Sequence, residues 1–111
     1  LIGLLIMVSA GRLLKETVHI LVEGMPDGMT ASAVADAMRA TPGVREVHDL
    51  HVWTLTSGMN VATAHLVVQD ATNAHDVLTN AQSVLATRHR IEHATLQVEA
   101  TPTKQCHEVT W

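Results

Sequence analysis

Histidine is the residue type of this sequence with the clearest chemical potential, because eight of the 111 residues are histidines. Imidazole is the commonest metal ligand among protein side chains, and it also changes charge near neutral pH. Phe and Tyr are absent and Trp occurs twice, so the aromatic side chains that usually line organic-ligand pockets are scarce. The composition therefore favours metal binding or pH sensing.

A divalent transition metal needs three or four nitrogen, oxygen or sulfur ligands at about 2.0–2.3 Å. The candidate ligands are the His, Glu and Cys side chains at His48, His65, His75, Glu92, His93, Glu99, Cys106 and His107. No two of them have the spacing of a zinc finger or of an HExxH helix. A metal site must therefore be assembled in space from different elements, and each histidine taken singly is more often a surface or hydrogen-bonded residue than a ligand. Cys106 and His107 form a soft-ligand pair, for which a loose tail is an equally good interpretation.

Charge and motifs argue against two other classes of function. Seven Lys and Arg residues against eleven Asp and Glu give a net charge of −4, whereas a nucleic-acid surface needs a basic patch. The sequence contains no nucleophile elbow, and Gly24-x-x-x-Gly28 lacks the Lys and Ser or Thr of a P-loop. We therefore expect neither nucleic-acid binding nor an enzyme. The single cysteine cannot form an intramolecular disulfide, which fits a reducing compartment.

The first 14 residues form an apolar segment with its own meaning. As a helix they would extend about 20 Å, which is too short to cross a bilayer core of about 30 Å. Arg12 and Lys15 at the end of this segment fit the cytoplasmic edge of a membrane. We interpret residues 1–14 as the C-terminal end of a transmembrane helix. The alternative is a buried helix of a soluble domain.

Hydrophobic periodicity and turn residues predict the remaining elements. Residues 15–29 form a linker helix and a hinge that ends in the breaker cluster Pro26, Asp27 and Gly28. A domain then covers residues 30–101, and residues 102–111 form a flexible tail. The elements expected in the domain are a helix capped by Thr30 or Ser32 and ending near Ala40, strands at 44–56 and 61–68 joined by a loop at 57–60, a helix at 74–87 and a strand at 94–99. This order predicts an α+β sandwich with both helices on one face of the sheet.

Strand alternation shows which candidate ligands share a face of the sheet. In the last strand, one face carries Ala94, Leu96 and Val98, and the other carries His93, Thr95, Gln97 and Glu99. The first face should pack against the helices, so Glu99 should lie on the face away from them. The same argument places His65 on that open surface. His48 has the wrong parity to join them, unless the first strand carries a bulge or bends near Asp49.

Four segments together resemble the C-terminal region of the cation diffusion facilitator family. They are HILVEGMP at His19–Pro26, PGVREVHDLHVWTLTSG at Pro42–Gly58, AHLVV at Ala64–Val68 and ATLQVE at Ala94–Glu99. The similarity covers essentially the whole chain and looks strongest to bacterial zinc, cobalt and cadmium exporters and to vesicular zinc transporters. It implies a ferredoxin-like, metallochaperone-like α-β-β-α-β domain that follows the last transmembrane helix. It also implies a homodimer in the cell inner (plasma) membrane, with this domain in the cytoplasm and metal–proton exchange in the absent membrane helices.

The resemblance also assigns candidate ligands by position. His48, His65 and Glu99 match family metal ligands, and His75 matches a further ligand of some members. Gln97 stands where some members have His, which argues against a full two-metal cluster. Glu92 replaces a ligating His of some vesicular transporters, and the adjacent His93 is the candidate substitute. Cys106 resembles C-terminal cysteines that ligate metal in some relatives, whereas His51 and Trp53 are interpreted as structural.

We expect zinc, or cobalt or cadmium, to bridge His48, His65 and Glu99 and to favour one arrangement of two such domains in a dimer. If His48 is a ligand, the first strand must be irregular near Asp49. The competing hypothesis is a stand-alone ferredoxin-like interaction or small-molecule sensor domain whose histidines are incidental. Apolar helices encoded before Leu1 would favour the transporter.

Overall fold

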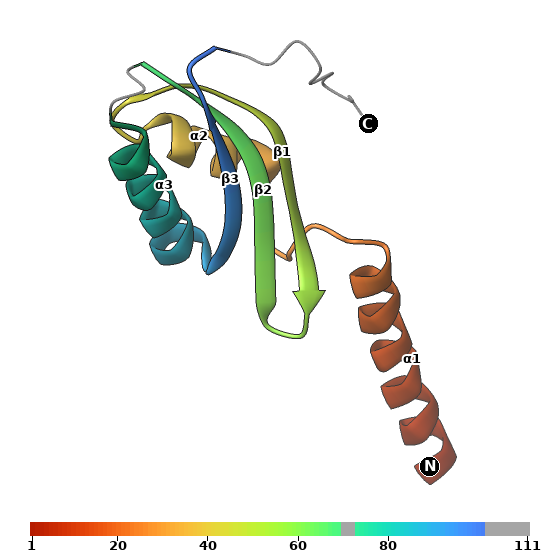
Figure 1. Cartoon of the computed structure of the whole chain (residues 1–111). Coiled ribbons are helices and arrows are strands. Elements are labelled where there is room, and N and C mark those ends of the chain that lie inside the picture. The colour runs from red at the N-terminus through yellow and green to blue at the C-terminus, as the bar shows by residue number, and fades with distance from the viewer. Residues whose placement is uncertain (70–72, 102–111) are drawn as a thin grey trace.

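The computed structural model describes residues 1–69 and 73–101. Its elements in chain order are α1 (Ile2–Leu21), α2 (Ala31–Arg39), β1 (Val44–Thr56), β2 (Met59–Val68), α3 (Ala74–His89) and β3 (His93–Glu99). Figure 1 shows a three-stranded sheet with α2 and α3 beside it and α1 projecting away from it. The order after α1 is the predicted helix, strand, strand, helix, strand. The predicted α+β, ferredoxin-like fold class is confirmed.

Helix α2 begins where the sequence predicts it. The Thr30 side chain accepts a hydrogen bond from the backbone N–H of Ala33 at 3.2 Å, so Thr30 rather than Ser32 is the N-cap. Val34 and Met38 lie one turn apart on the buried face of this helix, and neither is exposed to solvent. The helix ends before Pro42 and Gly43, as expected from these two breaker residues.

The sheet has the strand order β1-β2-β3. β1 and β2 are antiparallel, and β3 runs parallel to β2 after the crossover through α3. The prediction of a four-residue loop at 57–60 is wrong, because Met59 pairs with Thr56 and Asn60 pairs with Thr54. The turn is therefore Ser57-Gly58, and Gly58 adopts a φ of 78° that suits a tight hairpin.

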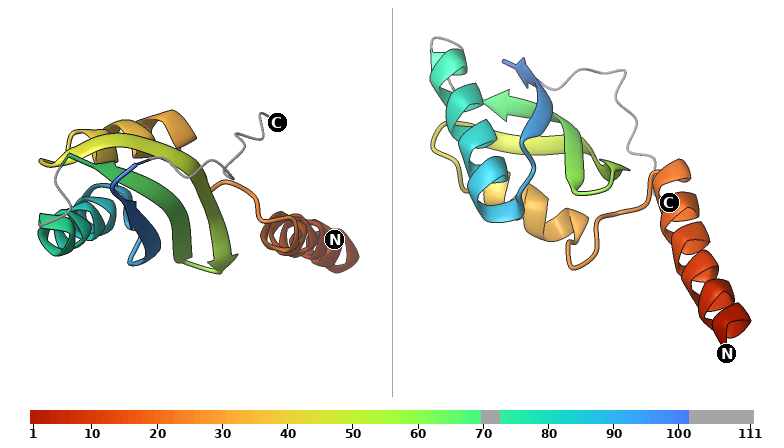
Figure 2. Two further views of the ribbon diagram at one scale, coloured as in Figure 1. Left: turned by 45° about the horizontal axis from the view of Figure 1, so that its top comes forward. Right: turned by 90° about the horizontal axis from the view of Figure 1, so that it is seen from below.

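Both helices cover the same face of the sheet, as predicted (Figure 2). The core between them is aliphatic, and its buried members are Val34, Met38, Val44, Val47, Val52, Ala62, Ala64, Leu66, Val68, Val77, Ala81, Leu85 and Ile91. Where a strand is regular, alternate residues enter this core, so the intervening side chains lie on the opposite face of the sheet, which α2 and α3 do not cover. That face carries the candidate ligands of the three strands.

The first strand is irregular near Asp49, as the family resemblance required. His48 pairs with His65 and His51 pairs with Thr63, so two residues of β1 oppose one residue of β2. Asp49 has a φ of 51°, in the left-handed region that Asp tolerates better than most residues. This bulge shifts the parity of β1 by one residue. His48 and His51 consequently both face away from the helices.

Helix α1 is continuous from Ile2 to Leu21 and buries none of its residues. The described part of the chain therefore does not bury this helix. Within residues 1–69 and 73–101, no helix has the length and hydropathy that crossing a membrane requires. The linker after α1 contacts the edge strand, because the backbone N–H of Thr54 donates to the Gly24 carbonyl at 3.2 Å.

Candidate metal centre

Each strand of the sheet contributes one side chain to a single cluster. His48 comes from β1, His65 from β2 and Glu99 from the end of β3. His48 Nε2 lies 3.3 Å from Glu99 Oε2, and His65 Nδ1 lies 2.8 Å from Glu99 Oε1. The two imidazole rings meet edge to face with centroids 5.1 Å apart. Sequence-distant residues are thus brought together by the register of the three strands and by the bulge in β1.

Glu99 is more buried than its position in the strand suggested. The sequence placed it on an open sheet surface, yet its side chain is 5% exposed, against 9% for His48 and 20% for His65. The two histidine rings cover the carboxylate, and Gln97 Nε2 donates a hydrogen bond to Glu99 Oε1 at 2.7 Å. A buried carboxylate requires partners of this kind, because desolvation of an unpaired charge is costly.

The donor atoms of the cluster fit a small divalent cation. One ligand atom from each of the three residues lies within 4.8 Å of the others. Two ligands held at about 2.0 Å in tetrahedral geometry are about 3.3 Å apart. His48 contacts Oε2 of Glu99 at 3.3 Å, whereas His65 contacts the other oxygen, Oε1, at 2.8 Å, so the donor atoms would have to rearrange around a shared ion. Two imidazole nitrogens and a carboxylate form a ligand set that suits zinc and similar transition metals.

Asp49 lies beside the cluster, although the sequence indicated it only as the place of a bend. Its Oδ1 lies 3.2 Å from His51 Nε2, and its Oδ2 lies 3.7 Å from His65 Nε2. His51, interpreted as structural, is therefore adjacent to the site. The signal that pointed to Asp49 was the parity conflict, since a bulge turns the side chain of its extra residue out of the regular alternation.

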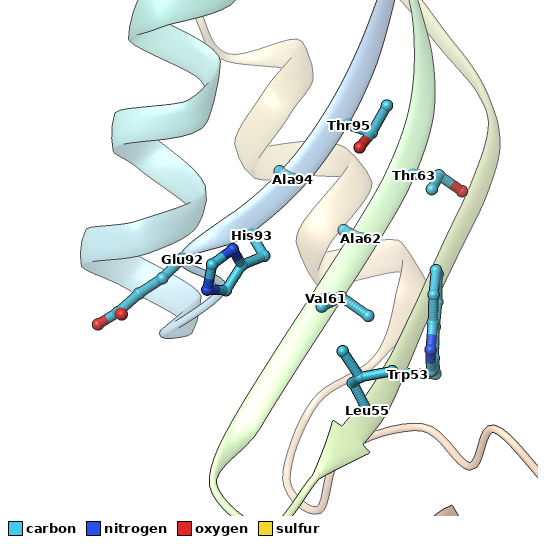
Figure 3. A pocket seen from close by; sticks show the side chains of 9 residues that line it. All are labelled: Trp53, Leu55, Val61, Ala62, Thr63, Glu92, His93, Ala94 and Thr95. Atoms are coloured by element: carbon cyan, nitrogen blue, oxygen red, sulfur yellow. The ribbon is translucent and has the colours of Figure 1, made fainter. Parts of the chain in front are cut away.

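His93 lies on the same sheet face as Glu99 but at the other end of β3. It pairs with Val61, six residues and about 20 Å of strand away from Glu99. Figure 3 shows its ring beside Val61, across a shallow hollow from Trp53 and Leu55. Glu92 lines the same hollow and is exposed. His93 therefore does not join the three-strand cluster.

The two remaining candidate ligands have different positions. His75 lies in the first turn of α3, which belongs to the helical layer, and within residues 1–69 and 73–101 it is no member of the cluster. Cys106 and the adjacent His107 lie outside the described residues. Of the eight candidate ligands named from the sequence, the part of the chain that the structure describes brings together three, His48, His65 and Glu99, and it places Asp49 beside them.

Comparison with known proteins gives a consistent result. Residues 26–101 match the family model described as the cytoplasmic domain of the cation efflux protein. The metal cation efflux system protein CzcD of Cupriavidus metallidurans is 41% identical over 106 residues, which cover 95% of this chain and 34% of that protein. The cadmium, cobalt and zinc/H(+)-K(+) antiporter of Bacillus subtilis is 32% identical over 103 residues, covering 89% of this chain and 32% of that protein. This chain therefore spans about a third of the length of these relatives.

A solved structure has the same fold. The metal-bound C-terminal domain of the CzcD transporter from Cupriavidus metallidurans superposes with a TM-score of 0.58 at 38% identity. The match covers 64% of this chain and 99% of that domain. The matched part is the size of the sandwich without α1, in agreement with the elements described above.

Proposed function

The chain belongs to the cation efflux protein family and carries its cytoplasmic domain, and from this membership we propose that it binds a divalent metal at His48, His65 and Glu99 to regulate an efflux transporter. The observation that carries the proposal is the convergence of these three side chains from three different strands. Without metal, the Glu99 carboxylate is paired with His48, His65 and Gln97, which offsets the cost of its burial. We propose that metal binding is the function of this convergence.

The three residues would act by linking the strands that bear them. His48 and His65 provide imidazole nitrogens and Glu99 provides carboxylate oxygens, and a bound cation would supply positive charge between them. A ligand shifts a conformational equilibrium only when it binds one state more tightly than the other. We propose that these residues hold metal in one arrangement of a homodimer, because the short name of the matching family model, ZT_dimer, refers to a dimer.

We propose zinc as the metal, with cobalt and cadmium as alternatives. Imidazole and carboxylate ligands suit zinc, and the name of the Bacillus subtilis relative includes all three metals. The imidazole nitrogens and the carboxylate bind metal only when deprotonated, so metal occupancy falls at acid pH. The named relatives are an efflux protein and an antiporter, so we propose no enzymatic role for this chain.

We propose that α1 lies at the inner (plasma) membrane. Its exposed side chains are largely apolar between Leu1 and Val8, and Leu13 and Leu14 remain 66% and 65% exposed. We propose that residues 1–14 are the end of a transmembrane helix, that residues 15–29 are its linker and hinge, and that residues 30–101 are the cytoplasmic metal-binding domain. In the whole transporter the metal would be exchanged for protons, as the antiporter name of the relative suggests.

A zinc titration of the full 111-residue chain by calorimetry tests this proposal. The parent chain should bind zinc, and the triple variant His48→Ala, His65→Ala and Glu99→Ala should not. The single variant Glu99→Gln keeps the shape of the side chain and should weaken zinc binding strongly while leaving the fold intact. His93→Ala is the matched control, because His93 lies on the same sheet face outside the cluster.

Two outcomes would contradict the proposal. Equal zinc binding by the parent and the triple variant would place the metal elsewhere, at His75 or at Cys106 and His107. Absence of binding in both would indicate a dimerisation or interaction domain whose histidines are incidental. Circular dichroism of each variant shows whether a loss of binding reflects a loss of fold.

A further inference from the structure

The turn of the β1–β2 hairpin lies beside the last third of α1 and points toward the N-terminal end of that helix (Figure 1). Ser57 Oγ in the turn is 3.4 Å from Glu16 Oε1 of the helix. Glu16 is two residues beyond Leu14, where the proposed transmembrane segment ends, and two helical residues rise about 3 Å. A headgroup layer is about 5–8 Å thick on each side of the hydrocarbon core. When α1 continues a transmembrane helix, the turn therefore lies at the level of the lipid headgroups.

Apolar side chains are exposed on both sides of this turn. Leu55 precedes it and is 52% exposed, and Met59 follows it and is 37% exposed. Of the large apolar side chains in residues 30–69 and 73–101, only these two are exposed. Trp53 lines a shallow hollow together with Leu55 (Figure 3). The apolar surface of the sandwich is thus concentrated at the end of the hairpin that faces the proposed membrane.

The C-terminal end of α3 brings basic side chains to the same place. Arg90 lines a second hollow together with Gly58 and Met59 of the hairpin. Arg88, in the last turn of α3, is exposed. Neither arginine forms an ion pair with another residue of the described part of the chain. Both positive charges are therefore available to an anionic partner, although Glu92 also lines the second hollow.

Helix α1 adds two further basic side chains near the turn. Arg12 and Lys15 are exposed, and both lie within one helical turn of Glu16. The region around the hairpin turn thus has four basic side chains against the carboxylates of Glu16 and Glu92, in a chain whose net charge is −4. This local excess of positive charge is complementary to anionic phosphate groups.

We propose that the hairpin end, defined as residues 55–59 with Arg88 and Arg90 of α3, docks on the anionic headgroup layer of the membrane from which α1 emerges. This inference rests on the proposal that residues 1–14 end a transmembrane helix, and it does not depend on metal binding. Lipid phosphates attract the two arginines, and Leu55 and Met59 enter the headgroup layer. Docking fixes the height and tilt of the sandwich relative to α1, which the hinge at residues 15–29 alone would leave free.

A fluorescent label at the turn tests this proposal in the full 111-residue chain. Cys106→Ser removes the single cysteine, and Met59→Cys then provides one site for a nitrobenzoxadiazole label. With vesicles of phosphatidylcholine and phosphatidylglycerol, the emission should shift to the blue, and lipid with a nitroxide on its headgroup should quench it. The same label on Glu46→Cys is the matched control. Glu46 is exposed on the same strand about 30 Å from the turn, so its label should not respond.

The contribution of charge is measured with the label at position 59. The double variant Arg88→Gln and Arg90→Gln should raise the lipid concentration for a half-maximal response by about 5-fold for each arginine. Arg39→Gln, at the exposed end of α2, is the control and should leave the response unchanged. Vesicles of phosphatidylcholine alone should give a weaker response than the anionic vesicles.

The outcomes distinguish this inference from the proposed function. A chain that does not sediment with vesicles would overturn both the docking and the membrane position of α1, while the zinc titration tests the metal site separately. A chain that sediments while the labels at 59 and 46 respond equally would refute the docking alone and would indicate a protein partner for this surface. Equal responses to neutral and anionic vesicles, or no effect of the double arginine variant, would refute recognition of anionic headgroups. Circular dichroism shows whether each labelled variant keeps the fold.

Discussion

At the scale of single residues, the Glu99 carboxylate is the group of the site that most needs polar partners, because it is buried. Its side chain is 5% exposed and contacts His48, His65 and the Gln97 amide. Of Glu99 and its three partners, Gln97 is the one that we do not propose as a metal ligand. Its hydrogen bond therefore contributes to the metal-free fold independently of metal binding.

Replacement of Gln97 by Ala should destabilise the metal-free chain. The amide donates to a carboxylate at 2.7 Å, and hydrogen bonds to charged groups are worth about 1.5–3 kcal/mol. Because the two histidines remain as partners of Glu99, we expect a loss of about 1–2 kcal/mol. Urea unfolding in the presence of a chelator measures this change.

A surface pair is the control for Gln97. Arg39 and Asp36 are 2.9 Å apart, but their side chains are 50% and 72% exposed. Arg39→Ala should therefore change the free energy of unfolding by less than about 1 kcal/mol. Gln97 is itself exposed, so equal effects of the two substitutions would show that the burial of its acceptor, Glu99, does not strengthen the hydrogen bond.

At the scale of elements, the short connection between α2 and β1 contacts both the end of β2 and helix α3. Gly43 has a φ of 90°, and its carbonyl accepts a hydrogen bond from the Gln69 N–H at 2.9 Å, at the end of β2. A Cβ at position 43 would lie 2.6 Å from Val77 Cγ2 of α3. The loop thus joins the start of β1 to the end of β2 and packs against α3.

Gly43→Ala should be strongly destabilising, by about 2–4 kcal/mol, because strain of the left-handed backbone adds to overpacking against Val77. Thermal unfolding followed by circular dichroism measures the effect. Gly28→Ala is the control, since Gly28 has a φ of 77° but nothing within 4 Å of the added Cβ. That variant should lose only the backbone contribution of about 1 kcal/mol. A Gly43→Ala loss no greater than the Gly28→Ala loss would contradict close packing of α3 on the loop.

At the scale of the whole molecule, α1 and the sandwich form an elongated particle of 64 × 28 × 17 Å. They meet at the edge strand, where Thr54 donates to the Gly24 carbonyl and Ser57 Oγ donates to Glu16 Oε1 at 3.4 Å. The edge strand β1 also carries His48 and the bulge. One strand therefore contacts both the linker and the proposed metal site.

Saturating zinc should change the separation of the two domains in the proposed homodimer. Metal held by His48, His65 and Glu99 would favour one arrangement of the two domains and would narrow the range of distances between them. Small-angle X-ray scattering of the full chain, with and without zinc, measures the radius of gyration. The triple variant of these residues is the control and should not respond. Identical scattering of the parent in both conditions would contradict the regulatory mechanism.

The fold was predictable from the sequence because its signals are local. Thr30, the Pro42-Gly43 pair and the alternation of β2 and β3 each act over a few residues. The exceptions were also local in origin. The hairpin turn was predicted two residues too long, because Gly58 with its positive φ already closes it and leaves Met59 and Asn60 free to pair with β1.

The candidate site was predictable only in part. The residue types indicated metal chemistry, and the family resemblance selected His48, His65 and Glu99. Alternation alone rejected His48, since parity counts residues and cannot show where a strand takes an extra one. The bulge at Asp49 and the burial of Glu99 depend on strand register and packing. Register is decided by contacts between residues far apart in the chain, so local patterns specify the elements and only their packing specifies which histidines meet.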